Sequence, residues 1–326
     1  MIIMKLVKKA VSVISWLAFA VLIAVGTYSL TSKVFSISAD LLRGNSVSDI
    51  VAEAVAPQSQ KREQGYLSQG EAVFELQRHL LNSDTEFELR FESDLDFTDR
   101  AVYKEYLFQP AVSEENSGGN PFAGAYLERR VIGGSVEMST WDHKHWTYYF
   151  ENYKYTVSAE DEARFEKRVY EVVDELGLNE AIWDGAKILR IYTFITSNCV
   201  YDYELLEASR NGQTTGCERG YTALGALEGK AVCKGISSLY QVLAKAAGLQ
   251  CEYVRGYGEY EPGCYGNHAW NLVLLDGNWY FLDSTFDLGQ PVYRYFLHGK
   301  YFEHHVLNTT AEFLNTHPIP DWPYSC

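Results

Sequence analysis

The apolar positions that follow Cys233 recur every three or four residues, which is the spacing of one face of an α-helix. The set comprises Ile236, Leu239, Tyr240, Leu243 and Ala247. Gly248 comes next and is typical of a helix C-terminus. The pattern therefore predicts a helix from about Cys233 to Ala247 that begins at the cysteine.

Two runs of apolar and aromatic residues, 269–275 and 279–282, predict a β-hairpin further along the chain. They flank Asp276-Gly277, a strong signal for a two-residue turn. Such a turn fixes the register of the two strands. In this register Leu275 pairs with Asn278, Leu274 with Trp279, and Leu272 with Phe281.

This register has a consequence for two polar residues at the open end of the hairpin. Trp270 would face Asp283, so His268 would lie on the same face as Asp283 and diagonal to it. Long side chains reach across such a diagonal. A three-residue loop would instead place the two on opposite faces of the sheet.

Ahead of Cys233 the pattern predicts two more helices. Ser158 and Asp161 resemble a capped helix start, and this helix is expected to run to about Leu176, where Gly177 ends it. A second helix is expected over residues 179–197, with one apolar face made of Ile188, Ile191, Tyr192 and Ile195.

Residues 70–155 are typical of a small α/β region. The expected elements are a helix near 72–81, strands near 87–91, 146–150 and 153–157, and a loop over 116–121. After the hairpin, residues 291–297 predict a last strand.

The first residues favour a membrane anchor. Residues 10–32 carry no charge and would reach roughly 34 Å as a helix, enough to cross a bilayer. Lys5, Lys8 and Lys9 precede this span and predict a cytoplasmic N-terminus with the body outside. Cleavage as a signal peptide near Ala24-Val-Gly26, followed by secretion, is the alternative.

The 326 residues carry a net charge of −15, which argues against nucleic acid as a partner. Six cysteines are too few for a disulfide scaffold of this size. A Cys217–Cys264 bridge is conceivable in loops, and Cys251 is expected to pack as a small apolar residue.

A cysteine at a helix N-terminus is a candidate nucleophile. Free N–H groups and the helix dipole both favour the thiolate of Cys233 and could receive an oxyanion. Gly235 in the first turn would let a substrate backbone approach closely. His268 and Asp283 then follow in the order of a base and the group that orients it.

Three separately spaced motifs carry a family resemblance. They read Gly229-Lys-Ala-Val-Cys233-Lys-Gly235, Gly266-Asn-His268-Ala-Trp270-Asn271 and Trp279-Tyr-Phe-Leu-Asp283-Ser-Thr-Phe286-Asp287, with Tyr201-Asp202-Tyr203 upstream. Over roughly residues 158–300 the chain resembles the transglutaminase-like superfamily. One departure is Ser284-Thr-Phe286, where many relatives have Pro-Thr-Trp.

The resemblance implies a papain-like α+β fold, in which a helix bearing the cysteine packs on an antiparallel sheet bearing the His and the Asp. Carried over by residue, Cys233 would be the nucleophile, His268 the base and Asp283 the orienting carboxylate. Further candidates for the oxyanion or substrate site are Tyr201, Lys234 and Trp270. Tyr201 could also be a core tyrosine, and Trp270 could simply form the wall of the site.

The expected organisation has four parts. They are a membrane segment over 1–32, a linker over 33–65, a small α/β region over 66–157 and a transglutaminase-like domain over 158–326. The chain would then be a membrane-anchored, bacterial-type member of the superfamily.

The chemistry implied is acyl transfer on amide bonds through a thioester, with hydrolysis of a protein, peptide or cell-wall peptide as the favoured outcome. Transglutaminase-type amine incorporation and a non-catalytic peptide-binding module are the alternatives. We expect no cofactor and no metal, because His143-Lys-His145 and His304-His305 lack metal-binding spacing and are interpreted as surface histidines.

Overall fold

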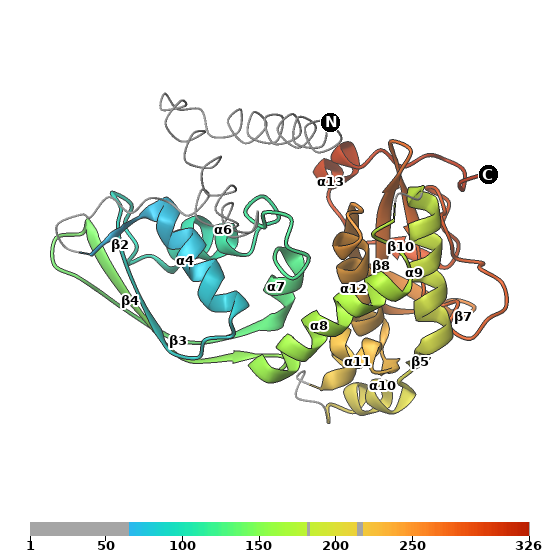
Figure 1. Cartoon of the computed structure of the whole chain (residues 1–326), viewed down its shortest axis with the longest axis horizontal. Helices are drawn as coiled ribbons and strands as arrows, with labels where there is room; N and C mark the ends of the chain where they lie inside the picture. Colours follow the sequence, from blue (N-terminus) through green and yellow to red (C-terminus); the bar gives the residue numbers. More distant parts are fainter. Residues whose placement is uncertain (1–64, 181–182, 214–217, 326) are drawn as a thin grey trace, which may run out of the picture. The chain divides into compact units, whose positions relative to one another are not determined.

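The computed structural model describes residues 65–180, 183–213 and 218–325 (Figure 1). The predicted membrane span over 10–32 and the predicted linker as far as residue 64 lie outside these residues. Among the helices of the described ranges, none has the length and apolar character needed to cross a bilayer.

The first group of elements surrounds a four-stranded sheet in the order β1-β2-β4-β3. Its elements are β1 Leu67–Ser68, α4 Gln69–Leu81, β2 Phe87–Glu92, α5 Arg100–Tyr103, the π-helix η1 Lys104–Phe108, α6 Gln109–Ala111, α7 Ala125–Arg130, β3 Val131–Thr140 and β4 His145–Tyr155. The helix predicted near 72–81 and the strand near 87–91 are confirmed. The two strands predicted at 146–150 and 153–157 are one continuous strand, β4.

Strand β3 escaped the prediction because its apolar positions are sparse: Gly133, Gly134, Ser135, Ser139 and Thr140 interrupt the run. It is held by pairing with β4 along nearly its whole length. Alternate residues of β2 and β4 instead point into an aromatic core beneath α4, which includes Phe91, Trp146 and Phe150. Tertiary pairing, and not local pattern, makes β3 a strand.

The second group carries the motifs. Its elements are α8 Ala159–Glu175, α9 Asp184–Asn198, β5 Val200–Tyr201, α10 Tyr203–Arg210, the 3₁₀ helix η2 Arg219–Tyr221, α11 Ala223–Leu227, β6 Lys230–Ala231, α12 Cys233–Ala246, β7 Cys251–Glu261, β8 Cys264–Leu275, β9 Asn278–Leu282, β10 His305–Leu307 and α13 Ala311–Thr316. The sheet has the order β10-β7-β8-β9, and all its pairs are antiparallel.

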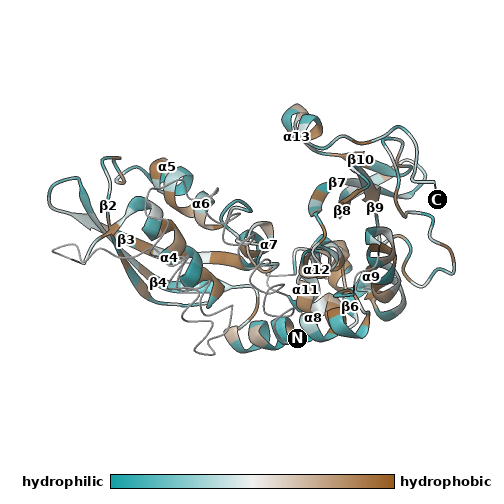
Figure 2. Ribbon diagram, turned by 45° about the horizontal axis from the view of Figure 1, so that its top comes forward, coloured by the Kyte–Doolittle hydropathy of each residue, from teal (hydrophilic) through white to brown (hydrophobic). Residues whose placement is uncertain are grey.

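Helix α12 packs on β7 and β8 and against α8 and α9 (Figure 1). Its inner side is entirely buried, including Ile236, Tyr240 and Leu243. Helix α8 mixes apolar and charged positions (Figure 2), and most of its charged side chains are exposed, with Glu162 the buried exception. Gly248 ends α12 with φ +79°, which a glycine adopts without strain. The predicted helix 233–247 is therefore confirmed. The fold is mixed α+β, with a cysteine-bearing helix on an antiparallel sheet.

The predicted helix over 158–176 is also confirmed, since the Ser158 hydroxyl accepts a hydrogen bond from the Asp161 N–H at 3.1 Å. The second predicted helix begins later than expected. Trp183 is its N-cap residue, so α9 starts at Asp184 and not at Asn179. The expected inner face of α9 is buried as predicted.

The hairpin has the predicted register: Leu275 pairs with Asn278, Leu274 with Trp279 and Leu272 with Phe281. Asp276 and Gly277 both have positive φ, +50° and +81°, as a two-residue hairpin turn requires. Strand β8 extends back to Cys264, so His268 lies within the strand and not before it.

The last strand is not where the sequence pattern placed it. Residues 291–297 form turns and bends. Here the Tyr295 carbonyl accepts a hydrogen bond from the Asp283 N–H, and the Tyr295 N–H donates to the Asp287 carboxylate, so neither group pairs with a strand. The fourth strand of the sheet is β10, which pairs with β7 through His305 and Gly258. It comes from a tail in which the sequence pattern shows no strand.

Arg130, at the end of α7, is a buried cation that ties three elements together. Its guanidinium donates to the carbonyls of Leu80 and Leu81 at 2.6 and 2.9 Å, at the C-terminus of α4. It also lies 3.6 Å from the Glu162 carboxylate on α8, and both side chains are almost fully buried. Tyr126 donates to the same carboxylate at 3.1 Å.

We predict that Arg130→Met lowers the free energy of unfolding by about 3 kcal/mol at neutral pH, because it leaves the Glu162 charge buried without its partner. Burial already raises the pKa of Glu162, so the penalty should shrink as the pH falls and the carboxyl takes up a proton. Urea unfolding at two pH values measures both effects. Arg164→Met, which removes an exposed pair with Asp161, is the control and should leave the free energy of unfolding nearly unchanged.

Candidate active site

Cys233 is the first residue of α12, and the N-cap residue Val232 supplies no side-chain hydrogen bond to the helix start. Short strand β6 delivers the chain to this point by pairing with β5. The thiol is partly buried and unbridged. It therefore lies at a helix N-terminus whose dipole favours a thiolate.

His268 reaches the thiol from β8. The imidazole Nε2 lies 2.7 Å from Asp283 Oδ2, which leaves Nδ1 for its hydrogen bond with Cys233. Gly258 on the neighbouring strand makes room for this ring, since a Cβ there would stand 2.9 Å from His268 Cγ. The structure therefore brings the three predicted residues into one hydrogen-bonded series.

Asp283 follows β9 directly and is completely buried. Its Oδ1 accepts from the Thr285 N–H at 2.8 Å, and its own N–H donates to the Tyr295 carbonyl at 2.9 Å. The Tyr192 hydroxyl donates to the Asp283 carbonyl oxygen at 2.9 Å. Main chain and side chain are thus both held in place.

The electrostatics favour an ion pair between Cys233 and His268. Burial alone would raise the pKa of the Cys233 thiol, but the hydrogen bond and charge of His268 outweigh it and lower the pKa. Burial alone would lower the pKa of His268, but the Asp283 carboxylate and the thiolate raise it to about 10. The pair is therefore biased towards thiolate and imidazolium.

Comparison with known proteins agrees with this arrangement. Residues 172–284 match the family model of the transglutaminase-like superfamily, and the matched stretch contains Cys233, His268 and Asp283. This part of the chain is a transglutaminase-like domain.

The chain is 30% identical over 126 residues to kyphoscoliosis peptidase from Mus musculus, covering 36% of this chain and 18% of that protein. It is 37% identical over 67 residues to kyphoscoliosis peptidase from Homo sapiens, covering 18% and 10%. The matched part therefore spans less than a fifth of the length of either relative. A solved structure of a TGase has a TM-score of 0.33 and 14% identity, covering 66% of this chain and 57% of that chain.

Within the transglutaminase-like domain, the other candidate residues have different surroundings. The Tyr201 hydroxyl forms hydrogen bonds with the Cys233 side chain and backbone N–H, so it lies beside the thiol. Trp270 is buried, stacks on the His268 ring at 5.7 Å and forms a wall of the site. Lys234 lies over the Tyr221 ring, 5.8 Å from its centroid, and is not among the residues that line the cavity at His268.

Gly235 does not serve the predicted close approach of a substrate. A Cβ at this position would meet the Gly220 and Thr222 carbonyl oxygens at 2.7 and 2.6 Å. The glycine therefore allows α12 to pack against the chain's own backbone at η2 and α11.

The predicted surface location of His304-His305 is wrong for His305. This side chain is buried, and its Nε2 lies 2.9 Å from the same Asp283 Oδ2 that bonds His268. Ligand atoms of His268, Asp283 and His305 lie within 4.8 Å of one another, so these three could hold a metal ion. His304 is partly exposed and pairs with Glu259 at 2.8 Å. No sequence signal places His305 here, because β10 itself was not predicted.

The cysteine expectations have mixed outcomes. Cys251 is buried in the core, as predicted. Cys264 is an exposed free thiol, and its suggested partner Cys217 lies outside the described residues.

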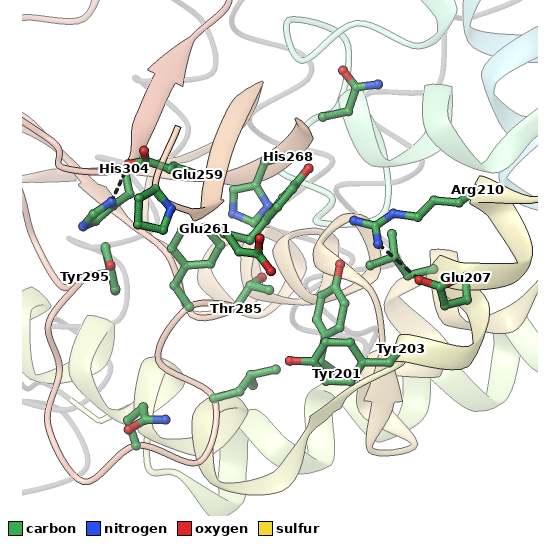
Figure 3. A pocket seen from close by; sticks show the side chains of 17 residues that line it. Tyr201, Tyr203, Glu207, Arg210, Glu259, Glu261, His268, Thr285, Tyr295 and His304 are labelled. Atoms are coloured by element: carbon green, nitrogen blue, oxygen red, sulfur yellow. Dashed lines mark hydrogen bonds and ion pairs between the residues drawn. The ribbon is translucent and has the colours of Figure 1, made fainter. Parts of the chain in front are cut away.

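A cavity of about 770 Å³ opens beside His268 (Figure 3). Tyr201 and Tyr203 line one side, and Glu261 and Tyr295 line the other. Further charged side chains at its rim are paired with each other, Glu207 with Arg210 and Glu259 with His304. The cavity is large enough for several residues of a peptide.

We expect the rate at which Cys233 reacts with iodoacetamide to fall less steeply from pH 8 to pH 6 than that of an ordinary thiol, which falls about tenfold per pH unit. The reason is that the hydrogen bond and charge of His268 lower the pKa of the Cys233 thiol against the effect of its burial, so more of it stays thiolate. The exposed free thiol of Cys264, labelled in the same reaction, is an internal reference. Mass spectrometry of the two labelled peptides gives both rates. Parallel pH profiles for the two cysteines would contradict the ion pair.

Gly258→Ala should displace the His268 ring, because the added Cβ and that ring compete for the same space. We predict that alkylation of Cys233 at pH 6 slows by roughly tenfold or more, while the protein stays folded. Gly70→Ala is the matched control, since a Cβ there meets nothing within 4 Å. Equal rates for the two variants would show that Gly258 does not position His268.

Proposed function

We propose that the protein is a cysteine-dependent hydrolase of amide bonds in protein or peptide substrates. The observation that supports this is the single series of hydrogen bonds from Cys233 through His268 to Asp283, in which both the thiol and the imidazole are biased towards their charged forms. The transglutaminase-like fold is consistent with acyl transfer in general. The peptidase reaction is the more specific part of the proposal.

In the first step the Cys233 thiolate attacks the amide carbonyl carbon, and a carbon–sulfur bond forms. The Cys233 N–H and the Tyr201 hydroxyl lie together beside the sulfur. The oxyanion develops on this side, where both groups can donate a hydrogen bond to the oxyanion. His268 Nδ1–H then gives its proton to the leaving amine nitrogen, and the carbon–nitrogen bond breaks. A thioester on Cys233 remains.

In the second step His268 takes a proton from water as the water oxygen attacks the thioester carbon. The carbon–sulfur bond breaks, the acid product leaves, and the Cys233 thiolate pairs again with the imidazolium. Asp283 keeps Nε2 protonated throughout, so that Nδ1 can accept and return the proton.

The cavity beside His268 supports a peptide as the substrate. It is open, it includes His268 and Tyr201 in a lining of aromatic rings and polar side chains, and it is large enough for a short extended segment. Protein, peptide and cell-wall peptides all present such amides. An amine in place of water would give transamidation from the same thioester, which is the alternative outcome.

The test uses a peptide library that includes cell-wall stem peptides, incubated with and without a labelled amine. We expect new amino termini, no amine incorporation, and loss of at least about 10³-fold in rate for Cys233→Ala. Asp283→Asn should lose a comparable factor while binding of peptides is retained. Amine incorporation would replace hydrolase by transferase. Binding without turnover, equal in wild type and Cys233→Ala, would leave only a peptide-binding module.

A further inference from the structure

The cavity beside His268 is lined by more acidic than basic side chains. Among the described residues that line it, Arg210 is the one arginine or lysine, and the glutamates are Glu207, Glu259 and Glu261. The whole chain has the same sign of charge, −15 in total. A concave surface with an excess of carboxylates attracts cations. The lining therefore favours a ligand that carries a positive charge.

Two of the three carboxylates are already occupied by the protein itself. Glu207 accepts a hydrogen bond from Arg210 at 3.2 Å. Glu259 uses both oxygens, since Oε2 lies 2.8 Å from His304 Nδ1 and Oε1 accepts the Gly263 N–H at 2.6 Å. The side chain of Glu261, in contrast, forms no hydrogen bond or ion pair with any described residue. Its carboxylate is therefore available to a ligand.

The backbone at the end of β7 directs Glu261 into the cavity. In a regular strand successive side chains point to opposite faces, yet Glu259, Tyr260 and Glu261 all line the cavity. The register between β7 and β8 shifts between Glu259 and Glu261, as it does at a β-bulge, and bulges re-aim side chains in this way. In Figure 3 the Glu261 side chain points into the cavity. Glu261 is also exposed, so a ligand in the cavity can reach it directly.

Aromatic rings around this carboxylate also suit a cationic ligand. The rings that line the cavity are Tyr201, Tyr203, Tyr260, Phe286 and Tyr295. Aromatic faces attract ammonium and guanidinium groups, and the apolar stem of a long basic side chain packs against such rings. Arg210 already lies in this way, with its guanidinium 5.9 Å from the centroid of the Tyr260 ring.

We propose that the cavity selects peptides with a cationic group close to the scissile amide, and that Glu261 is the residue that determines this specificity. His268 and Glu261 line one cavity, so a peptide whose amide lies at Cys233 and His268 brings its neighbouring groups within reach of the Glu261 carboxylate. The inference rests on the proposed function in taking this cavity as the place where the substrate binds.

The test compares peptides that differ only by lysine or norleucine at one position, scanned along both sides of the scissile bond, with both termini blocked. At the best position we expect wild type to cleave the lysine peptide with a kcat/KM higher by about fivefold or more. In Glu261→Gln this ratio should fall to near one, and in Glu261→Lys a glutamate peptide should be preferred to the norleucine peptide. Because Glu261 is exposed, the lysine preference of wild type should shrink as salt is added.

Glu137→Gln is the control for a loss of negative charge anywhere on the chain. Glu137 is an exposed strand residue on β3, its side chain also lacks a hydrogen bond or ion pair with any described residue, and it does not line the cavity. This variant should keep the lysine-to-norleucine ratio of wild type. The same ratio in Glu261→Gln as in wild type would overturn the proposal while amide cleavage remained established.

Binding of the same peptides separates this inference from the proposed hydrolysis. Fluorescently labelled lysine and norleucine peptides are titrated with full-length Cys233→Ala, which retains the cavity, and with the same protein carrying Glu261→Gln. A preference for lysine that is lost with Glu261→Gln supports the proposal even if wild type cleaves no peptide. A norleucine peptide with a free amino terminus shows, by the same dependence on Glu261, whether a terminal ammonium can be the cation. Equal affinity of Cys233→Ala for the charged and the uncharged peptides overturns the proposal.

Discussion

The carboxylate of Asp283 has no contact with solvent, and it remains ionised only because hydrogen-bond donors converge on it from several elements. An isolated buried carboxylate would instead take up a proton. Loss of that charge would remove the bias that keeps His268 protonated and, through it, the bias of Cys233 towards thiolate. Helix α12 supplies the thiol, the β8–β9 hairpin supplies His268 and Asp283, and β10 supplies His305, so each element brings a group that depends on this carboxylate or contacts it.

The parts of this arrangement that short-range signals determine could be predicted from the sequence. The start of α12 at Cys233, the cap at Ser158 and the two-residue turn at Asp276-Gly277 are each set within a few residues of the chain. The length of the turn sets the register of β8 and β9, and the register decides which side chains share a face of the sheet. The contact between His268 and Asp283 could therefore be predicted from the turn.

The parts that escaped prediction depend on partners distant in sequence. Strand β10 has three residues and no alternating pattern, and it exists because β7 offers an edge. The sequence pattern therefore led to the wrong prediction that His305, which lies on β10, is a surface histidine. Gly235 was given a role towards substrate because the chain that packs against it, at Gly220 and Thr222, cannot be located from local sequence. Tyr201 was a candidate through the family resemblance alone, because the pairing of β5 with β6 that brings it to the thiol cannot be predicted from local sequence.

Turns at the surface ordinarily tolerate insertions and deletions between homologues. The turn at Asp276-Gly277 is an exception, although it lies at the far end of the hairpin from the imidazole. One added residue would have to be absorbed as a bulge within β8 or β9, or the alternation of faces would carry His268 away from both its partners. The length of this exposed loop is therefore constrained by chemistry that takes place at the opposite end of the strands.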